Sequence, residues 1–232
     1  MATKKNVAAP AAEEKEVKVD FVTRYSKLIY GCLIGVVILV VAGFFFFNHR
    51  NKMKEESATR SAAAIAHMEI ALASADSTEF LLALEGDGED LGFLGLLDEY
   101  GARGGEAIYL NTAICELNLG RYDEAIAHAE DYDTDDPVMA SRALSVIGNA
   151  QMQKGNWAEA KKAFLEAAEE LDTYLAAYPL LNAGIAAEKL GQLEEALDCY
   201  RKIDKRYAKE AEGLNIEAQI ARVEALLDRA SK

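Results

Sequence analysis

The sequence predicts an all-α protein in which a single N-terminal transmembrane helix is followed by an α-solenoid, a stack of paired helices. Two observations support this prediction. Residues 28–47 form an uncharged and mostly apolar run, and a short segment recurs three times beyond residue 105 at intervals of 35 and 36 residues. Repetition at a period of this length is typical of stacked helical hairpins.

The chain begins with residues 1–27, which mix alanine, proline, lysine and glutamate. Such a segment buries too little apolar surface to offset its chain entropy, so we expect a disordered arm. A slight excess of lysine and arginine before the apolar run favours a cytoplasmic position for this arm. Basic residues also follow the run, which leaves the opposite orientation open.

Residues 28–47 read LIYGCLIGVVILVVAGFFFF and contain no charge and no proline. A helix of this length spans about 30 Å, the thickness of a bilayer hydrocarbon core. Helix is the expected conformation because every backbone polar group inside lipid needs an internal partner. No small-residue cleavage site follows, so we expect a retained anchor rather than a removed signal peptide.

The predicted span also carries small residues at helical spacing. Gly31, Gly35 and Gly43 lie on nearly the same face of the expected helix. Small residues at this spacing let a second transmembrane helix approach closely, although the motif also arises by chance in apolar segments. These three glycines are therefore a hypothetical partner face.

Residues 48–105 predict a helical stalk and a degenerate first repeat. Residues 48–75 lack glycine and proline and are rich in helix formers. Asp76 or Ser77 is expected to cap a short helix, and residues 93–100 predict another that ends at Gly101. Positions spaced near 3.6 predict a mostly apolar stripe made of Ala58, Ala62, Ile65, Met68, Glu69 and Leu72.

Residues 106–211 contain three related units. Each has a small residue seven positions before a glycine, a large apolar residue two positions after that glycine, and an alanine three further on. We interpret each unit as two antiparallel helices joined at the glycine, which supplies a positive φ. The small residues are Ala113, Gly148 and Gly184; the glycines Gly120, Gly155 and Gly191; the large residues Tyr122, Trp157 and Leu193; the alanines Ala125, Ala160 and Ala196.

This frame resembles the tetratricopeptide repeat, so we expect three TPR-like repeats over residues 106–211 and a C-terminal capping helix over 212–232. The whole arrangement, with the phrases GFLGLLDEYG and ICELNLGRYDEAI, resembles YfgM-type ancillary subunits of the SecYEG translocon, especially those of bacteroidetal type. The resemblance implies a single-pass protein of the bacterial inner membrane with its C-terminal domain in the periplasm.

The same resemblance implies partners and a role. They are the SecYEG translocon, a PpiD-type membrane-anchored prolyl isomerase, and unfolded or nascent secreted proteins. The implied role is that of a non-enzymatic scaffold or chaperone-like adaptor for newly translocated chains. The alternative is a cytosol-facing anchored TPR receptor, or an assembly scaffold for another membrane complex, which requires the opposite orientation.

In a TPR superhelix the first helix of each unit lines the inner groove. A clamp for acidic chain ends needs several basic donors, and only two candidates here are basic, so we favour a partly apolar groove for an extended or helical segment. Each apolar candidate is equally compatible with ordinary core packing. The candidate groove residues are Leu110, Ile114, Asn118, Arg142, Ser145, Asn149, Gln153, Tyr178, Leu181, Ile185 and Lys189.

Charge and composition exclude several other functions. The net charge is −14, and since the arm contributes +2 and the span nothing, the remainder carries −16, which argues against nucleic acid as a partner. We expect no enzymatic activity, no cofactor and no metal site. The acidic residues 131–136 predict a solvated loop, because they lack the glycine and glutamate of a calcium loop.

Histidines and cysteines give no further site. His67 and His128 are expected on solvated helix faces, and His49 at the membrane interface. Cys115 and Cys199 fall in different units, too far apart for a disulfide, so we expect both as buried free thiols.

Overall fold

The structure is a computed structural model and describes residues 21–230. Over these residues the chain forms twelve α-helices, two short 3-10 helices and no strand, which confirms the predicted fold class. The arm predicted for residues 1–27 falls mostly on residues 1–20, which lie outside the described residues. The first helix already begins at Phe21, inside the range assigned to the arm.

The chain divides into two units, Met1–His49 and Arg50–Lys232. Helix α1 (Phe21–Arg60) is the longest element, and by length and composition it is able to cross a membrane. Most of its large apolar side chains from Leu28 to Phe47 are exposed. An apolar surface of this extent is costly in water and is removed from it in lipid. The predicted apolar helix is therefore confirmed as a possible membrane anchor.

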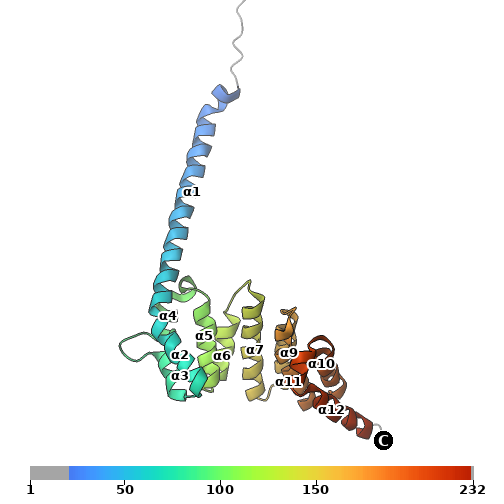
Figure 1. The fold of residues 1–232 in the computed structure, drawn as a ribbon. Helices are drawn as coiled ribbons and strands as arrows, with labels where there is room; N and C mark the ends of the chain where they lie inside the picture. Colours follow the sequence, from blue (N-terminus) through green and yellow to red (C-terminus); the bar gives the residue numbers. More distant parts are fainter. Residues whose placement is uncertain (1–20, 231–232) are drawn as a thin grey trace, which may run out of the picture. The chain divides into compact units, whose positions relative to one another are not determined.

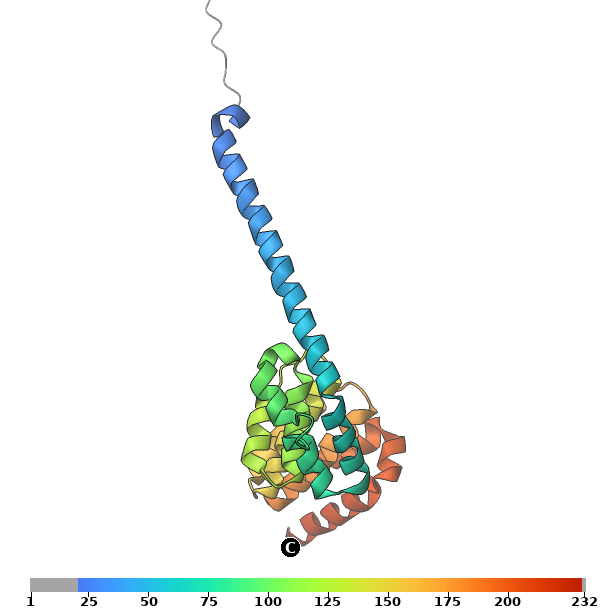
Figure 2. The same ribbon diagram turned by 90° about the vertical axis from the view of Figure 1, so that its left-hand side faces the viewer.

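The second unit consists of the end of α1 and a series of short helices. In Figure 1 the helices α5 to α10 follow one another across this unit, and in the turned view of Figure 2 they overlap. The elements are α2 (Ala62–Ser74), α3 (Ser77–Glu85), α4 (Phe93–Tyr100), η1 (Gly101–Gly104), α5 (Ala107–Asn118), α6 (Tyr122–Glu130), α7 (Pro137–Gln153), α8 (Trp157–Glu169), η2 (Tyr174–Ala176), α9 (Ala177–Lys189), α10 (Leu193–Arg206), α11 (Ala208–Gly213) and α12 (Ile216–Ala230).

Side-chain caps start two of these α-helices. The Asp76 carboxylate accepts a hydrogen bond from the backbone N–H of Thr78, so the predicted cap of α3 is confirmed. Asp136 accepts hydrogen bonds from the backbone N–H groups of Val138 and Met139 at the start of α7. Pro137 suits the first turn, where the N–H group that it lacks would have no partner within the helix.

The predicted stripe on residues 58–72 is largely wrong. Of its members Met68 is buried and Ile65 partly buried, whereas Leu72 and the remaining three are exposed. The true buried face consists mostly of small side chains, which allow α2 and α3 to pack closely. A search for large apolar residues misses such a face. The buried face consists of Ser57, Ser61, Ala64, Met68 and Ala71.

The end of α1 within the second unit is joined to α4 through Tyr100, which is almost fully buried. The Arg60 guanidinium donates a hydrogen bond to the Tyr100 hydroxyl at 3.0 Å, and this hydroxyl donates to Glu56 at 3.3 Å. Arg60 also pairs with Glu99. These hydrogen bonds satisfy the hydroxyl group of the buried Tyr100 side chain.

The three repeat glycines end the first helix of each pair, as predicted. Gly120, Gly155 and Gly191 have φ values of 77°, 80° and 74°, a conformation that side chains disfavour. The backbone N–H of each of these glycines donates a hydrogen bond to a carbonyl in the last turn of the helix before it, which is α5, α7 or α9. The chain can therefore reverse within a few residues, which sets the antiparallel pairing of the two helices.

Close packing within the later pairs depends on the predicted small residues. A Cβ atom added to Gly148 would lie 2.8 Å from the Phe164 ring, and one added to Gly184 would overlap the Tyr200 ring. Both rings are completely buried. In the first pair, Ala113 takes the place of the glycine, and Ala129 on α6 takes the place of the aromatic ring. Gly148 and Gly184 thus each leave the space that an aromatic ring of the neighbouring helix fills.

Candidate protein-binding site

The structure divides the eleven predicted groove residues into buried and accessible sets. Leu110 and Ile114 are only 4% and 6% exposed and belong to the hydrophobic core, so they are not available to a partner. Leu181 is half-buried and packs against the core formed by α9, α10 and α12. The remaining residues keep accessible surface: Asn118, Arg142, Gln153, Tyr178 and Lys189 are exposed, and Ser145, Asn149 and Ile185 are half-buried.

One of the two basic groove candidates already has a partner. The Lys189 ammonium lies 5.7 Å from the centre of the Trp157 ring, within range for a cation–π interaction. This contact joins the end of α9 to the start of α8. Arg142 is exposed on α7. The accessible groove residues therefore form a mixed surface, with Tyr178 its most prominent large side chain at 58% exposed.

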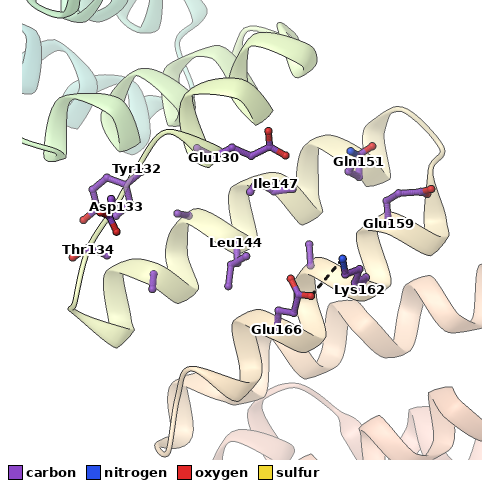
Figure 3. A pocket seen from close by; sticks show the side chains of 14 residues that line it. Glu130, Tyr132, Asp133, Thr134, Leu144, Ile147, Gln151, Glu159, Lys162 and Glu166 are labelled. Carbon is purple, nitrogen blue, oxygen red and sulfur yellow. Dashed lines mark ion pairs between the residues drawn. The ribbon is translucent and has the colours of Figure 1, made fainter. Parts of the chain in front are cut away.

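The structure also contains a pocket that sequence reasoning did not predict. It has a volume of about 480 Å³ and lies between the end of α6, one face of α7, and α8 (Figure 3). This volume is within the range of small ligand sites. The lining residues are Ala129, Glu130, Tyr132, Asp133, Thr134, Ala140, Ala143, Leu144, Ile147, Gln151, Glu159, Lys162, Ala163 and Glu166.

The short second helix of the first pair leaves this pocket open. Helix α6 has 9 residues, whereas its counterparts α8 and α10 have 13 and 14. The chain leaves α6 after Glu130 and continues as an irregular segment to Asp136. At 1.5 Å per residue, the four missing residues leave about 6 Å of α7 without a covering helix.

The pocket lies on the opposite side of α7 from the predicted groove residues. Leu144 and Ile147 line the pocket, and each is two positions from a groove candidate, Arg142 or Asn149. Two positions along an α-helix correspond to a rotation of about 200°. The two surfaces of α7 therefore face away from each other.

The floor and the rim of the pocket differ in chemistry. Half-buried Leu144 and Ile147 form an apolar floor together with four alanines. The charged lining residues are Glu130, Asp133, Glu159, Glu166 and Lys162. The Lys162 ammonium lies 3.7 Å from the Glu166 carboxylate, and a dashed line marks this ion pair in Figure 3. With one basic and four acidic residues, the rim as a whole is acidic.

The comparison with known families agrees with this architecture. Residues 146–211 match a family model described as Tetratricopeptide repeat. The matched region runs from the second half of α7 into α11 and includes the two glycine–aromatic contacts. A search of curated proteins found no match.

Tetratricopeptide repeats generally serve as non-enzymatic scaffolds that bind other proteins. Within the described residues, no group of histidine, cysteine, aspartate and glutamate side chains could hold a metal ion. Cys115 and Cys199 are buried free thiols, as predicted. Burial raises the pKa of the Cys115 thiol to about 12, which keeps it protonated and unreactive.

The two histidines expected on solvated faces are instead paired. His128 on α6 hydrogen-bonds through Nδ1 to Glu116 on α5 at 2.7 Å, and His67 bonds to Glu79 at the same distance. Glu116 is only 2% exposed, and its burial raises the pKa of its carboxyl, against the opposite effect of the His128 hydrogen bond. Spacing along one helix could not reveal these contacts, because each joins two different helices.

A second polar network joins α9, α10 and α12. The Tyr200 hydroxyl donates to the Glu188 carboxylate at 2.6 Å, and the Arg222 guanidinium donates two bonds to the same carboxylate at 2.5 and 2.6 Å. The Arg222 hydrogen bonds lower the pKa of Glu188. Helix α12 is thereby fixed to the last helix pair by a bidentate contact.

We expect Glu188→Gln to destabilise the protein by about 1–2 kcal/mol at neutral pH. Because the pKa of Glu188 is lowered by folding, its contribution is present above the ordinary glutamate pKa of 4.5 and is lost as pH falls through the folded value. Urea unfolding of the detergent-solubilised chain at several pH values, followed by fluorescence of Trp157, the only tryptophan, measures the effect.

The control is Glu224→Gln, which removes a half-exposed ion pair with Arg201 and should change stability by less than about 0.5 kcal/mol. The difference in unfolding free energy between Glu188→Gln and the unsubstituted chain should become smaller as the pH is lowered. A difference that stays constant as the pH is lowered would contradict this account of Glu188.

Proposed function

We propose that this chain is a membrane-anchored scaffold whose helical repeat binds other proteins without catalysing a reaction. The observation that carries the proposal is the match of residues 146–211 to a tetratricopeptide repeat, in a chain that also has a helix able to span a membrane. The accessible mixed surface around Tyr178 and the pocket on the other side of α7 supply surfaces for such binding.

Within this function, we propose that the helical domain lies in the periplasm and acts at the SecYEG translocon. There it would work beside a PpiD-type prolyl isomerase as an adaptor for newly translocated, unfolded chains. The resemblance of the anchor, the stalk and the repeat frame to YfgM-type subunits supports this assignment. The acidic character of the residues after the span also suits a role that needs no contact with nucleic acid.

Cysteine labelling in intact cells tests the orientation. A cysteine introduced at Lys232 should react with a membrane-impermeant maleimide once the outer membrane is permeabilised, whereas a cysteine at Thr3 should not. The buried native Cys115 and Cys199 should react little. Labelling of the Lys232 position only in inverted vesicles would reject the periplasmic assignment and favour the cytosol-facing receptor.

The glycine face of the span provides a test of association inside the membrane. Added Cβ atoms at Gly31, Gly35 and Gly43 would meet nothing within 4 Å, so these positions are free for a partner helix. We expect Gly31→Leu/Gly35→Leu to reduce crosslinking to the translocon by about tenfold, because leucine keeps the backbones apart.

The matched control for this experiment is Val37→Leu/Val41→Leu, which has the same spacing on another face of the helix and should leave crosslinking unchanged. Equal recovery of the translocon with both double variants would exclude the glycine face as its docking site. Site-specific photo-crosslinking in intact membranes is the appropriate measurement.

A further inference from the structure

We propose that the pocket bounded by α6, α7 and α8 binds an extended peptide segment in which an apolar side chain is flanked by lysine or arginine. This inference rests on the proposed protein-binding function and assigns it a site and a ligand chemistry. The occupant follows from three features: an apolar floor, an acidic rim and an unpaired stretch of backbone.

The floor selects an apolar side chain. Leu144 and Ile147 are half-buried, and the other apolar lining residues are alanines, whose short side chains leave room for a large aliphatic or aromatic group. Burial of such a group against these side chains is favourable in proportion to the apolar area removed from water. The volume of about 480 Å³ accommodates a side chain together with part of its backbone.

The rim selects positive charge beside that side chain. Glu130 and Asp133 lie on one side of the floor, and Glu159 and Glu166 on α8 lie on the other, as Figure 3 shows. The only basic lining residue, Lys162, is already close to Glu166. The surplus carboxylates therefore attract lysine or arginine on both sides of an apolar anchor and repel acidic segments.

The segment between α6 and α7 favours a peptide over an isolated small molecule. In the described chain, no backbone–backbone hydrogen bond involves Asp133, Thr134 or Asp135. Two of these residues line the pocket. Their N–H and C=O groups remain able to pair with the backbone of an extended peptide, which is a recurring mode of peptide recognition.

Peptide binding to the full chain tests the proposal. The protein is reconstituted into phosphatidylcholine nanodiscs, whose neutral headgroups do not attract a basic peptide. The probe is a short fluorescein-labelled peptide with one leucine between two arginines, measured by fluorescence anisotropy. Replacing the leucine by alanine, or both arginines by glutamate, should weaken binding by about tenfold or more.

Two double variants with the same change of net charge locate the site. Glu159→Lys/Glu166→Lys reverses two exposed rim carboxylates and should weaken binding of the leucine–arginine peptide by about tenfold. Glu194→Lys/Asp198→Lys reverses two exposed carboxylates on α10 and should change affinity by less than about twofold. Equal losses in both would show attraction by overall charge only and overturn the assignment.

A pocket-filling variant tests the floor separately. Ala140→Phe places a ring over Leu144 and Ile147 and should weaken binding of the leucine peptide by about tenfold, with circular dichroism confirming that the helices are retained. Binding that survives both Ala140→Phe and the rim variant would overturn the proposal. Self-association that the rim variant abolishes would instead assign the pocket to a second copy of this chain.

The failure of this inference is distinguishable from failure of the proposed function. If peptide binding survives the pocket variants but is lost on Tyr178→Ala, the tetratricopeptide region binds proteins through the other surface and only the pocket assignment fails. If no peptide binds and crosslinking to the translocon is also absent, the proposed function fails with it.

Discussion

Val36→Arg/Val40→Arg is expected to release the chain from membranes. Each arginine near the centre of a transmembrane helix costs about 2.5–3.5 kcal/mol on the insertion scale, so the pair costs about 6 kcal/mol. Both valines are exposed along α1, in the apolar part that is long enough to cross a bilayer. No other helix of comparable length and hydropathy occurs in the described residues.

Carbonate extraction of membranes, followed by detection of the chain in pellet and supernatant, measures this effect. Val36→Leu/Val40→Leu keeps the apolar character and should remain in the pellet like the unsubstituted chain. If the arginine variant also stays in the pellet, helix α1 is not what holds the chain to the membrane.

Phe164→Ala is expected to destabilise the helical domain by about 3–5 kcal/mol. The Phe164 ring is fully buried and fills the space beside Gly148, where an added Cβ would lie 2.8 Å from it. Its removal leaves a cavity between α7 and α8 that these helices cannot close without moving. Urea unfolding of the solubilised chain, followed by Trp157 fluorescence, measures the loss.

Two controls make this prediction specific. Tyr174→Ala truncates an aromatic side chain that is 57% exposed and should cost less than about 1 kcal/mol. Gly148→Ala/Phe164→Ala recreates the alanine–alanine pairing of the first unit, and should cost less than the sum of the single variants because the added methyl no longer meets a ring. Simple additivity would show that the two positions are not packed together.

The fold could be predicted in large part because its signals are local and repeated. The glycines at 120, 155 and 191 each mark a positive-φ helix end, and three agreeing registers exclude coincidence. The small residues at 148 and 184 could be interpreted from their position alone, since a helix pair at close distance needs them. The apolar span is also a local signal of composition and length.

The binding surfaces were less accessible to sequence reasoning. The groove candidates Leu110 and Ile114 proved to be core, because the same apolar residue serves either role and only burial distinguishes them. The pocket results from the early end of α6, whose significance emerges only from comparison with α8 and α10. The Glu116–His128 contact joins two different helices. Residue spacing within either helix therefore could not predict it.

The order in which helices pack has a consequence for how the domain acquires its structure. From α2 onward, each α-helix makes its substantial contacts with α-helices that are at most two α-helices away along the chain. Such a topology has low contact order and is expected to fold rapidly, because little loop entropy is lost before each contact forms. The N-terminal hairpins can therefore assemble while the C-terminal part of the polypeptide is still being synthesised, and each new hairpin docks on a surface that already exists.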